Sequence, residues 1–251
     1  MGGSLGYEGN IINDVKGAMQ RFKMDKVDTL YIHRSDSNTP LAETHGGINE
    51  IYKVGHFARF GLSNYLPDEV EAVYEHCKAH GYVLPSVYQG NYSAVARKLE
   101  IILFLTLRRL GISFYGYSVL AGGFLTKTKE QIIGGEGRFN KEVIGGLYSW
   151  MYAKQSYFEA PEELNEIAMD EGCSKAALAY RRAAYNSPLK NEYGDVVIVW
   201  ASSLKQTDQT LRGLKAGPLR NDAWRRINAM GMTIEHDAPL DNFHDIKGEG
   251  Q

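Results

Sequence analysis

Short apolar runs alternate with longer amphipathic stretches along the chain, and this alternation limits the folds that the sequence can adopt. The run at 27–33, Val-Asp-Thr-Leu-Tyr-Ile-His, is rich in β-branched and aromatic residues. Strands of a parallel sheet, covered on both faces, have such nearly continuous apolar runs. Because longer helical patterns follow the apolar runs, the sequence predicts β/α units and a parallel sheet.

The same patterns place the individual elements of the fold. Strands are expected at 27–33, 58–63, 83–89, 112–117 and 196–200. Helices are expected at 13–22, 41–54, from Pro67 onward, at 101–110, 162–171 and 175–186, and from Ser203 or Leu204 onward. Gly55 is the expected C-cap of the second helix. We predict a single domain over 1–251, with an N-terminal arm at 1–12 and a loose polar tail at 236–251.

Two architectures accommodate five such units, a doubly wound open sheet and part of a TIM barrel. No G-x-G-x-x-G motif follows the first predicted strand, which counts against a Rossmann dinucleotide site. In either architecture the functional side chains collect at the carboxyl ends of the strands.

Composition excludes several classes of protein. The 28 Lys and Arg residues nearly balance the 30 Asp and Glu residues, so no charge excess favours a nucleic acid or a membrane surface. The two cysteines, Cys77 and Cys173, have no metal-ligand spacing, and no metal site is expected. The start of the chain lacks the pattern of a signal peptide, and no stretch is apolar enough to span a membrane. A cytoplasmic protein is therefore expected.

Every predicted strand ends in side chains that can form hydrogen bonds. The five ends carry His-Arg-Ser-Asp at 33–36, Ser-Asn-Tyr at 63–65, Tyr-Gln-Gly-Asn-Tyr at 88–92, Tyr-Ser at 117–118 and Ala-Ser-Ser at 201–203. Amides, hydroxyls and aromatic rings suit a neutral or aromatic ligand better than a metal ion. The strand ends therefore predict one rim that binds a small organic molecule.

Five motifs follow one another along the chain. They are Asp-Thr-Leu-Tyr-Ile-His at 28–33, Gly-Leu-Ser-Asn-Tyr at 61–65, Val-Tyr-Gln-Gly-Asn-Tyr at 87–92, Leu-Ala-Gly-Gly-Phe-Leu-Thr at 120–126 and Ser-Ser-Leu-Lys-Gln at 202–206. In this order they resemble the aldo-keto reductases, and the branch that they resemble most is the aflatoxin-aldehyde reductase type. The element Gly-Arg-Phe at 137–139 is shared with that branch. The resemblance covers about 14–219 and implies a TIM barrel that binds NADPH across its rim.

The resemblance also implies roles for individual residues. His33 corresponds to the catalytic histidine, which orients the substrate carbonyl. The remaining residues form two groups. The implied cofactor-binding residues are Ser63, Asn64, Gln89, Tyr117, Ser118, Leu120, Gly122, Gly123, Arg138, Ser202, Ser203, Gln206 and Gln209. The implied substrate contacts are Tyr65, Tyr92 and Tyr152.

The family's aspartate, tyrosine and lysine lie on the first three barrel strands, for which this sequence leaves no room before the helix at 13–22. We therefore expect an N-terminally truncated barrel, with strands four to eight present and only His33 of the catalytic tetrad retained. Within the matched region, Trp200 stands where the family has glycine, and its bulk would narrow the adenosine groove.

Three functions stay open from the sequence. The first is an NADPH-dependent aldehyde or ketone reductase with another proton donor, for which His33 is the first candidate. The second is a cofactor-independent cyclase, dehydratase or isomerase of secondary metabolism, which would use His33 and the rim tyrosines on an aromatic or polyketide-like molecule. The third is a non-catalytic pseudoenzyme. Because a barrel of five strands leaves open edges, a homo-oligomer, in particular a dimer, is expected.

Overall fold

The computed structural model describes residues 8–244. Contacts between residues divide them into two compact units, one of residues 8–89 with 105–113 and the other of 90–104 with 114–244. The boundary between the two units passes through the third strand, within the range predicted to be a single domain.

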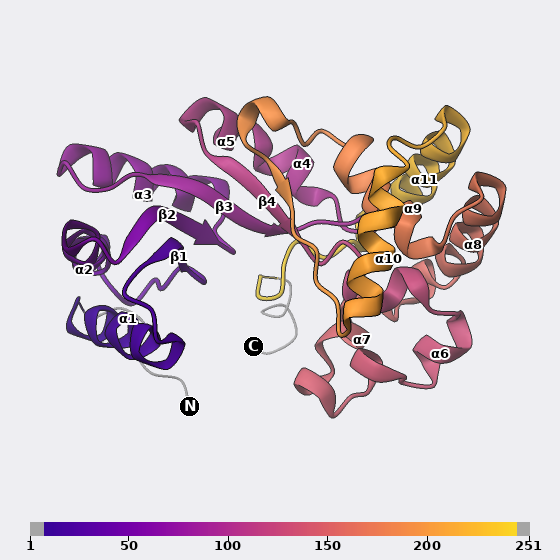
Figure 1. Ribbon diagram of the computed structural model, residues 1–251, viewed down its shortest axis with the longest axis horizontal. Helices are drawn as coiled ribbons and strands as arrows, with labels where there is room; N and C mark the ends of the chain where they lie inside the picture. Colours follow the sequence, from indigo (N-terminus) through magenta and orange to yellow (C-terminus); the bar gives the residue numbers. More distant parts are fainter. Residues whose placement is uncertain (1–7, 245–251) are drawn as a thin grey trace. The chain divides into compact units, whose positions relative to one another are not determined.

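Parallel strands form the centre of the first unit. They are β1 (Val27–Ile32), β2 (Phe57–Ser63) and β3 (Pro85–Asn91), whose last two residues belong to the second unit. Val27 aligns with Phe57, and Ser63 aligns with Gln89. The helices α1 (Glu8–Phe22), α2 (Leu41–Val54) and α3 (Pro67–Ala79) run along one side of these strands (Figure 1).

Burial explains why these segments pack as they do. Phe60 and Leu62 of β2 are fully buried, as is Val70 on α3. A fully buried aliphatic or aromatic side chain stabilises the fold by about 1.5–3 kcal/mol relative to an exposed one. The helix α2 ends at Gly55, which has φ +87°, so the predicted C-cap is confirmed.

Helices and 3-10 helices make up most of the second unit. Its strands are β4 (Ser113–Tyr117, with Ser113 in the first unit) and β5 (Val196–Val197), which pair in parallel through Tyr115 with Val196 and Gly116 with Val197. Its helices are α4 (Lys98–Ile102), α6 (Lys129–Ile133), α7 (Leu147–Tyr152), α8 (Ala160–Glu171), α9 (Lys175–Tyr185), α10 (Leu204–Lys215) and α11 (Asn221–Thr233).

The 3-10 helices of the second unit are η1 (Ala121–Thr126), η2 (Gly137–Phe139), η3 (Val143–Gly146), η4 (Gln155–Tyr157), η5 (Asn191–Tyr193) and η6 (Glu235–Asp237). The last helix of the fold, α5 (Phe104–Leu110), begins in the second unit and lies otherwise in the first. The α/β class and the parallel pairing are confirmed. Strands that pair within each unit are also neighbours in the sequence, an order consistent with a (β/α) barrel.

One carboxylate joins three segments of the second unit. The Glu171 side chain, at the end of α8, is only 3% exposed and accepts hydrogen bonds from Arg181 Nη2 at 2.9 Å and Arg220 Nε at 2.9 Å. Arg181, on α9, also donates to the backbone carbonyl of Gly217 at 2.7 Å. Both charges of the buried pair are thereby compensated.

Four predictions about the elements were wrong in part. The expected helix at 101–110 is two helices, α4 and α5, with the break at the fully buried Leu103. The expected strand at 196–200 pairs only through Val196–Val197, because the chain then leaves the sheet and Trp200 is 64% exposed. The helix expected at 13–22 begins at Glu8, so 8–12 is no extended arm.

The fourth prediction concerned the C-terminal tail. Up to residue 244 the tail is packed rather than loose, because Ala238 and Asp241 are buried and Asp237 accepts a hydrogen bond from Ser156. Residues 245–251 and 1–7, also part of the predicted tail and arm, lie outside the described residues. Within 8–244, no helix combines the length and the apolar character that crossing a membrane requires.

Candidate active site

Four predicted site residues lie together where β1, β2 and β3 end. The Asn64 side-chain amide donates hydrogen bonds to the His33 backbone carbonyl at 2.8 Å and to Ser63 Oγ at 3.1 Å. Ser63 Oγ in turn donates to the Gln89 backbone carbonyl at 2.8 Å. This chain of bonds links the ends of three adjacent strands, and it holds His33 and Gln89 at one rim.

The local backbone explains how this arrangement forms. Asn64 has φ +55°, in the left-handed region that asparagine tolerates better than most residues. Ser63 and Asn64 are nearly fully buried, at 3% and 2% exposure, whereas His33 is exposed and Gln89 is partly exposed. The two buried side chains therefore position the rim, and the imidazole and the amide above them can meet a ligand.

The three predicted substrate tyrosines lie in different surroundings. Tyr92 is fully buried, and its hydroxyl bonds Glu100 and accepts from Arg182 Nη1 at 3.0 Å. Tyr152 is also fully buried, and its hydroxyl lies 3.4 Å from Asn91 Nδ2. Both hydroxyls have protein partners within the second unit.

Tyr65 lies at a cavity of about 340 Å³ in the first unit, next to the loop that follows β1. No local pattern in the sequence predicts this cavity, because its walls come from a loop and two helices. Burial, followed by the charges of Glu69 and Asp36, raises the pKa of the Tyr65 hydroxyl.

The segment after β4 forms a tight turn in the second unit. Ser118 has φ +62°, and Gly122 and Gly123 have φ +68° and +105°. A Cβ at Gly122 would lie 2.0 Å from the Tyr148 ring, whereas one at Gly123 would meet no atom closer than 3.9 Å. Both packing and backbone conformation therefore require glycine at position 122. At position 123 the lack of a side chain leaves the backbone open to a ligand.

Arg138 lies over two aromatic rings of the second unit. Its guanidinium is 4.3 Å from the centroid of the Trp200 ring and 5.4 Å from that of Tyr148, and Nη1 donates to the Tyr148 hydroxyl at 3.2 Å. Both distances are within the range of a cation–π interaction. The Trp200 ring, which the sequence led us to expect in the adenosine groove, contacts this guanidinium. Neither ring partner was predicted from the sequence.

The N-terminus of α10 carries three further predicted residues. Ser203 is the N-cap and accepts a hydrogen bond from the Gln206 backbone N–H at 3.3 Å. Gln206 Oε1 accepts from the backbone N–H of Ser202 at 3.0 Å and from its hydroxyl at 2.8 Å. The start of the helix is exposed, and the positive end of its dipole favours the binding of an anion there. Gln209 is exposed one turn further on.

The remaining predicted residues flank these groups. Tyr117, Ser118 and Leu120 are partly exposed.

Lys175, which the sequence did not single out, donates to the Lys127 backbone carbonyl at 2.8 Å just after the turn, and burial lowers its pKa. Among residues 8–244, no three His, Cys, Asp or Glu side chains are grouped as a metal site would need. The second unit thus has a cation, a glycine turn and a helix start, all suited to phosphate groups.

Comparison with known proteins agrees with this chemistry. The model of the aldo/keto reductase family matches residues 2–231. An aldo-keto reductase of Pseudocercospora fijiensis is 40% identical over 79% of this chain and 68% of its own length. The oxidoreductase sirO of Leptosphaeria maculans is 34% identical over 91% of this chain and 70% of its own length.

The aflatoxin B1 aldehyde reductase member 2 of Rattus norvegicus is 33% identical over 92% of this chain and 65% of its own length. The chain thus spans about two thirds of the length of these relatives. A family match over most of the sequence, together with strand ends that carry the expected amide, hydroxyl and imidazole groups, leads to one conclusion. The chain belongs to the aldo/keto reductase family.

Proposed function

We propose that the chain is an NADPH-dependent reductase of aldehydes or ketones, with His33 as the residue that orients the substrate carbonyl. The observation that carries the proposal is the hydrogen-bonded chain from His33 through Asn64 and Ser63 to Gln89. It gives the rim of the first unit one exposed imidazole and one carboxamide, the groups that a carbonyl substrate and a nicotinamide amide need. The reductase names of the relatives support the same reaction class.

The donor sets of the chain fit NADPH. In the first unit, the partly exposed Gln89 offers an amide group for the carboxamide of the cofactor, and the buried Asn64 and Ser63 hold the rim around it. In the second unit, Arg138 is held by its aromatic partners, and the turn at Gly123 has room that a side chain would fill. When bound, NADPH would supply the hydride that reduces the carbonyl carbon.

The role of His33 follows from its exposure at the end of β1. An imidazole N–H that donates to the carbonyl oxygen fixes its direction and stabilises the negative charge that forms there on reduction. A protonated imidazole can also pass its proton to that oxygen, which completes the alcohol. Tyr92 is fully buried and its hydroxyl is already bonded to Arg182, so His33 is the group that would transfer the proton.

We propose that the five strands correspond to strands four to eight of an aldo-keto reductase barrel, and that the protein forms a dimer that covers the edges of the sheet. Light scattering at micromolar concentration tests the dimer, and a monomeric mass would contradict it.

The reaction is tested with NADPH titration, followed by energy transfer from tryptophan, and with turnover of 4-nitrobenzaldehyde. We expect His33→Ala to bind NADPH as the wild type does and to lose about 100-fold in kcat. His80→Ala, which removes an exposed imidazole at the end of α3, is the matched control and should keep wild-type kcat. Absence of NADPH binding in the wild type would refute the proposal and favour cofactor-independent acid–base chemistry or a pseudoenzyme.

A further inference from the structure

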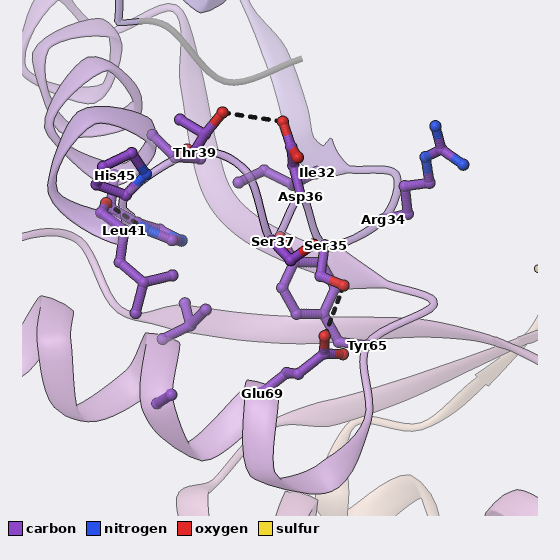
Figure 2. Close-up of a pocket in the computed structure, with 14 residues that line it drawn as sticks. Ile32, Arg34, Ser35, Asp36, Ser37, Thr39, Leu41, His45, Tyr65 and Glu69 are labelled. Atoms are coloured by element: carbon purple, nitrogen blue, oxygen red, sulfur yellow. Dashed lines mark hydrogen bonds between the residues drawn. The ribbon is translucent and has the colours of Figure 1, made fainter. Parts of the chain in front are cut away.

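The first unit contains a cavity next to the rim that carries His33. The cavity of about 340 Å³ lies between the loop after β1, the first turn of α2 and the start of α3 (Figure 2). Its walls include Ile32, Arg34 and Asp36, whereas His33, Ser63, Asn64 and Gln89 do not line it. Its volume is at the low end of the range of about 300–1,000 Å³ that is usual for small-molecule sites.

Tyr65 provides the first sign that the cavity is built for a ligand. The residue is only 5% exposed, and its backbone N–H and carbonyl are both bonded to the Tyr88 hydroxyl, at 3.2 and 2.9 Å. Its own hydroxyl, however, forms no hydrogen bond with any residue in the part of the chain that the structure describes. Tyr65 lines the cavity, so a ligand there can bond this hydroxyl without displacing a protein partner.

Two carboxylates give the cavity its charge. Asp36 accepts hydrogen bonds from the Asn38 backbone N–H at 3.0 Å and from Thr39 Oγ1 at 2.9 Å, and these bonds hold its pKa below the ordinary value. Glu69 accepts from Ser35 Oγ at 2.6 Å and from the Leu66 backbone N–H at 2.6 Å. A carboxylate has about four lone-pair positions, so each of the two can accept a further donor.

The bases that line the cavity do not cancel this charge. His45 is 1% exposed, its Nδ1–H donates to the Leu41 carbonyl at 2.8 Å, and burial lowers its pKa to about 4, so its imidazole is neutral at pH 7. The Arg34 side chain extends away from the other labelled residues (Figure 2). The charge of Arg34 still acts on Asp36, but two carboxylates against one cation leave the lining with a net negative charge, which favours a cation over an anion.

The remaining walls decide the kind of cation. Ile32, Leu41 and Val73 add aliphatic surface to the lining of the cavity. A bare metal ion would gain nothing from such surface, whereas an organic body would be desolvated against it. We propose that this cavity binds a small organic ammonium ion with an apolar body, held by the Tyr65 hydroxyl oxygen and the carboxylates of Asp36 and Glu69. The proposal does not depend on the reduction of a carbonyl.

The test is an NMR titration of the full chain with benzylammonium chloride at pH 7. Benzyl alcohol, which has nearly the same shape and no charge, is the matched control probe. We expect saturable shifts in the amide resonances of 34–45 and 65–73 with benzylammonium. Benzyl alcohol should bind at least about tenfold more weakly, because hydrogen bonds from a charged donor are the stronger ones.

Two substitutions locate the interaction. Tyr65→Phe keeps the ring and removes the hydroxyl, and Glu69→Gln removes the charge while a glutamine can still complete the cap of α3. Each should weaken benzylammonium binding by about three- to tenfold. Tyr52→Phe, which removes a hydroxyl from the 40% exposed tyrosine on α2, should leave the affinity unchanged.

Three results would overturn the proposal: no saturable shift with benzylammonium, equal affinity for the charged and the neutral probe, or wild-type affinity in both Tyr65→Phe and Glu69→Gln. The first two use the wild-type protein alone, so the proposal can be refuted even if a variant fails to fold.

Discussion

The side-chain amide of Asn64 lies 2.8 Å from the backbone carbonyl of His33, and this bond joins the end of β2 to the end of β1. Asn64 holds this position in a left-handed backbone conformation. A residue that no ligand needs to touch can thus determine where the proposed catalytic imidazole lies.

Substitution of Asn64 separates the two parts of its role. Asn64→Gly keeps the backbone conformation and loses the hydrogen bonds, whereas Asn64→Ala loses the bonds and also strains the backbone. We expect Asn64→Ala to lower the free energy of unfolding by about 1 kcal/mol more than Asn64→Gly. Urea denaturation measures both, and equal stability of the two variants would contradict a strained residue 64.

Because Gly122 packs against Tyr148, the effect of a substitution at position 122 on stability should depend on the residue at position 148. Gly122→Ala places a methyl group 2.0 Å from the Tyr148 ring, and we expect a loss of about 2 kcal/mol or more in the free energy of unfolding. In a Tyr148→Ala background the clash is gone, so the same substitution should cost only the backbone strain, about 1 kcal/mol. Additive effects of the two substitutions would rule out the contact as the cause.

Burial of the neutral His45 imidazole predicts a loss of stability in mild acid. Because burial lowers its pKa from 6.5 to about 4, the unfolded chain binds a proton at this position that the folded chain does not. Its contribution is therefore present above pH 6.5 and lost as the pH falls from 6.5 toward 4, by at most about 3 kcal/mol.

The measurement compares urea unfolding of the wild type, His45→Leu and His80→Ala at pH 7, 5.5 and 4.5. His45→Leu should flatten the pH dependence, although the charge-coupled neighbour His76, whose pKa burial also lowers, will leave part of it. His80→Ala should keep most of the wild-type slope, because it removes only the smaller effect of the His80 charge on His76. An unchanged slope in His45→Leu would show that another group is responsible.

Arg138 predicts how salt affects NADPH affinity. If its guanidinium meets a phosphate of the cofactor, Arg138→Gln should weaken NADPH binding by about tenfold at low salt and make the affinity less sensitive to added salt. Trp200→Phe keeps an aromatic face under the guanidinium and should change the affinity much less. Equal salt sensitivity in the wild type and Arg138→Gln would place Arg138 away from the phosphates.

Substitution of Tyr92 tests whether this residue stabilises the fold or contacts the substrate. Its hydroxyl bonds Glu100 and Arg182 in the core, so Tyr92→Phe should cost about 1–3 kcal/mol of stability and leave KM unchanged. A changed KM with unchanged stability would restore the predicted substrate role.

Local patterns predicted the elements whose signals lie in consecutive residues. The strand at 27–32 and the helix at 41–54 were found from apolar runs and from Gly55. The helix α11 was missed, although Ala223, Ile227, Met230 and Ile234 are buried with helical spacing. The strand predicted at 196–200 was too long, because only Val196 and Val197 pair with β4. The end of this pairing depends on the neighbouring strand and not on the apolar run itself.

The candidate site shows the same division. The motif at 61–65 indicated that Ser63 and Asn64 belong to the rim. It did not indicate that their side chains form hydrogen bonds to the backbone carbonyls of Gln89 and His33. The rings that hold Arg138 come from residues 10 and 62 positions away in the chain, so no local pattern pairs them. The cavity at Tyr65 likewise depends on where a loop and two helices meet.

The buried carboxylate of Glu171 has a consequence for how the second unit opens. Burial by itself raises the pKa of Glu171, but the hydrogen bonds from Arg220 and the charge and hydrogen bond of Arg181 lower it by more. The net effect lowers the pKa, so the carboxylate stays charged in the folded chain. Separation of α8, α9 or the segment at 217–220 from the others would leave that charge without a partner. Amide hydrogens of these three segments should therefore exchange with solvent deuterium at one common rate, as a single cooperative unit.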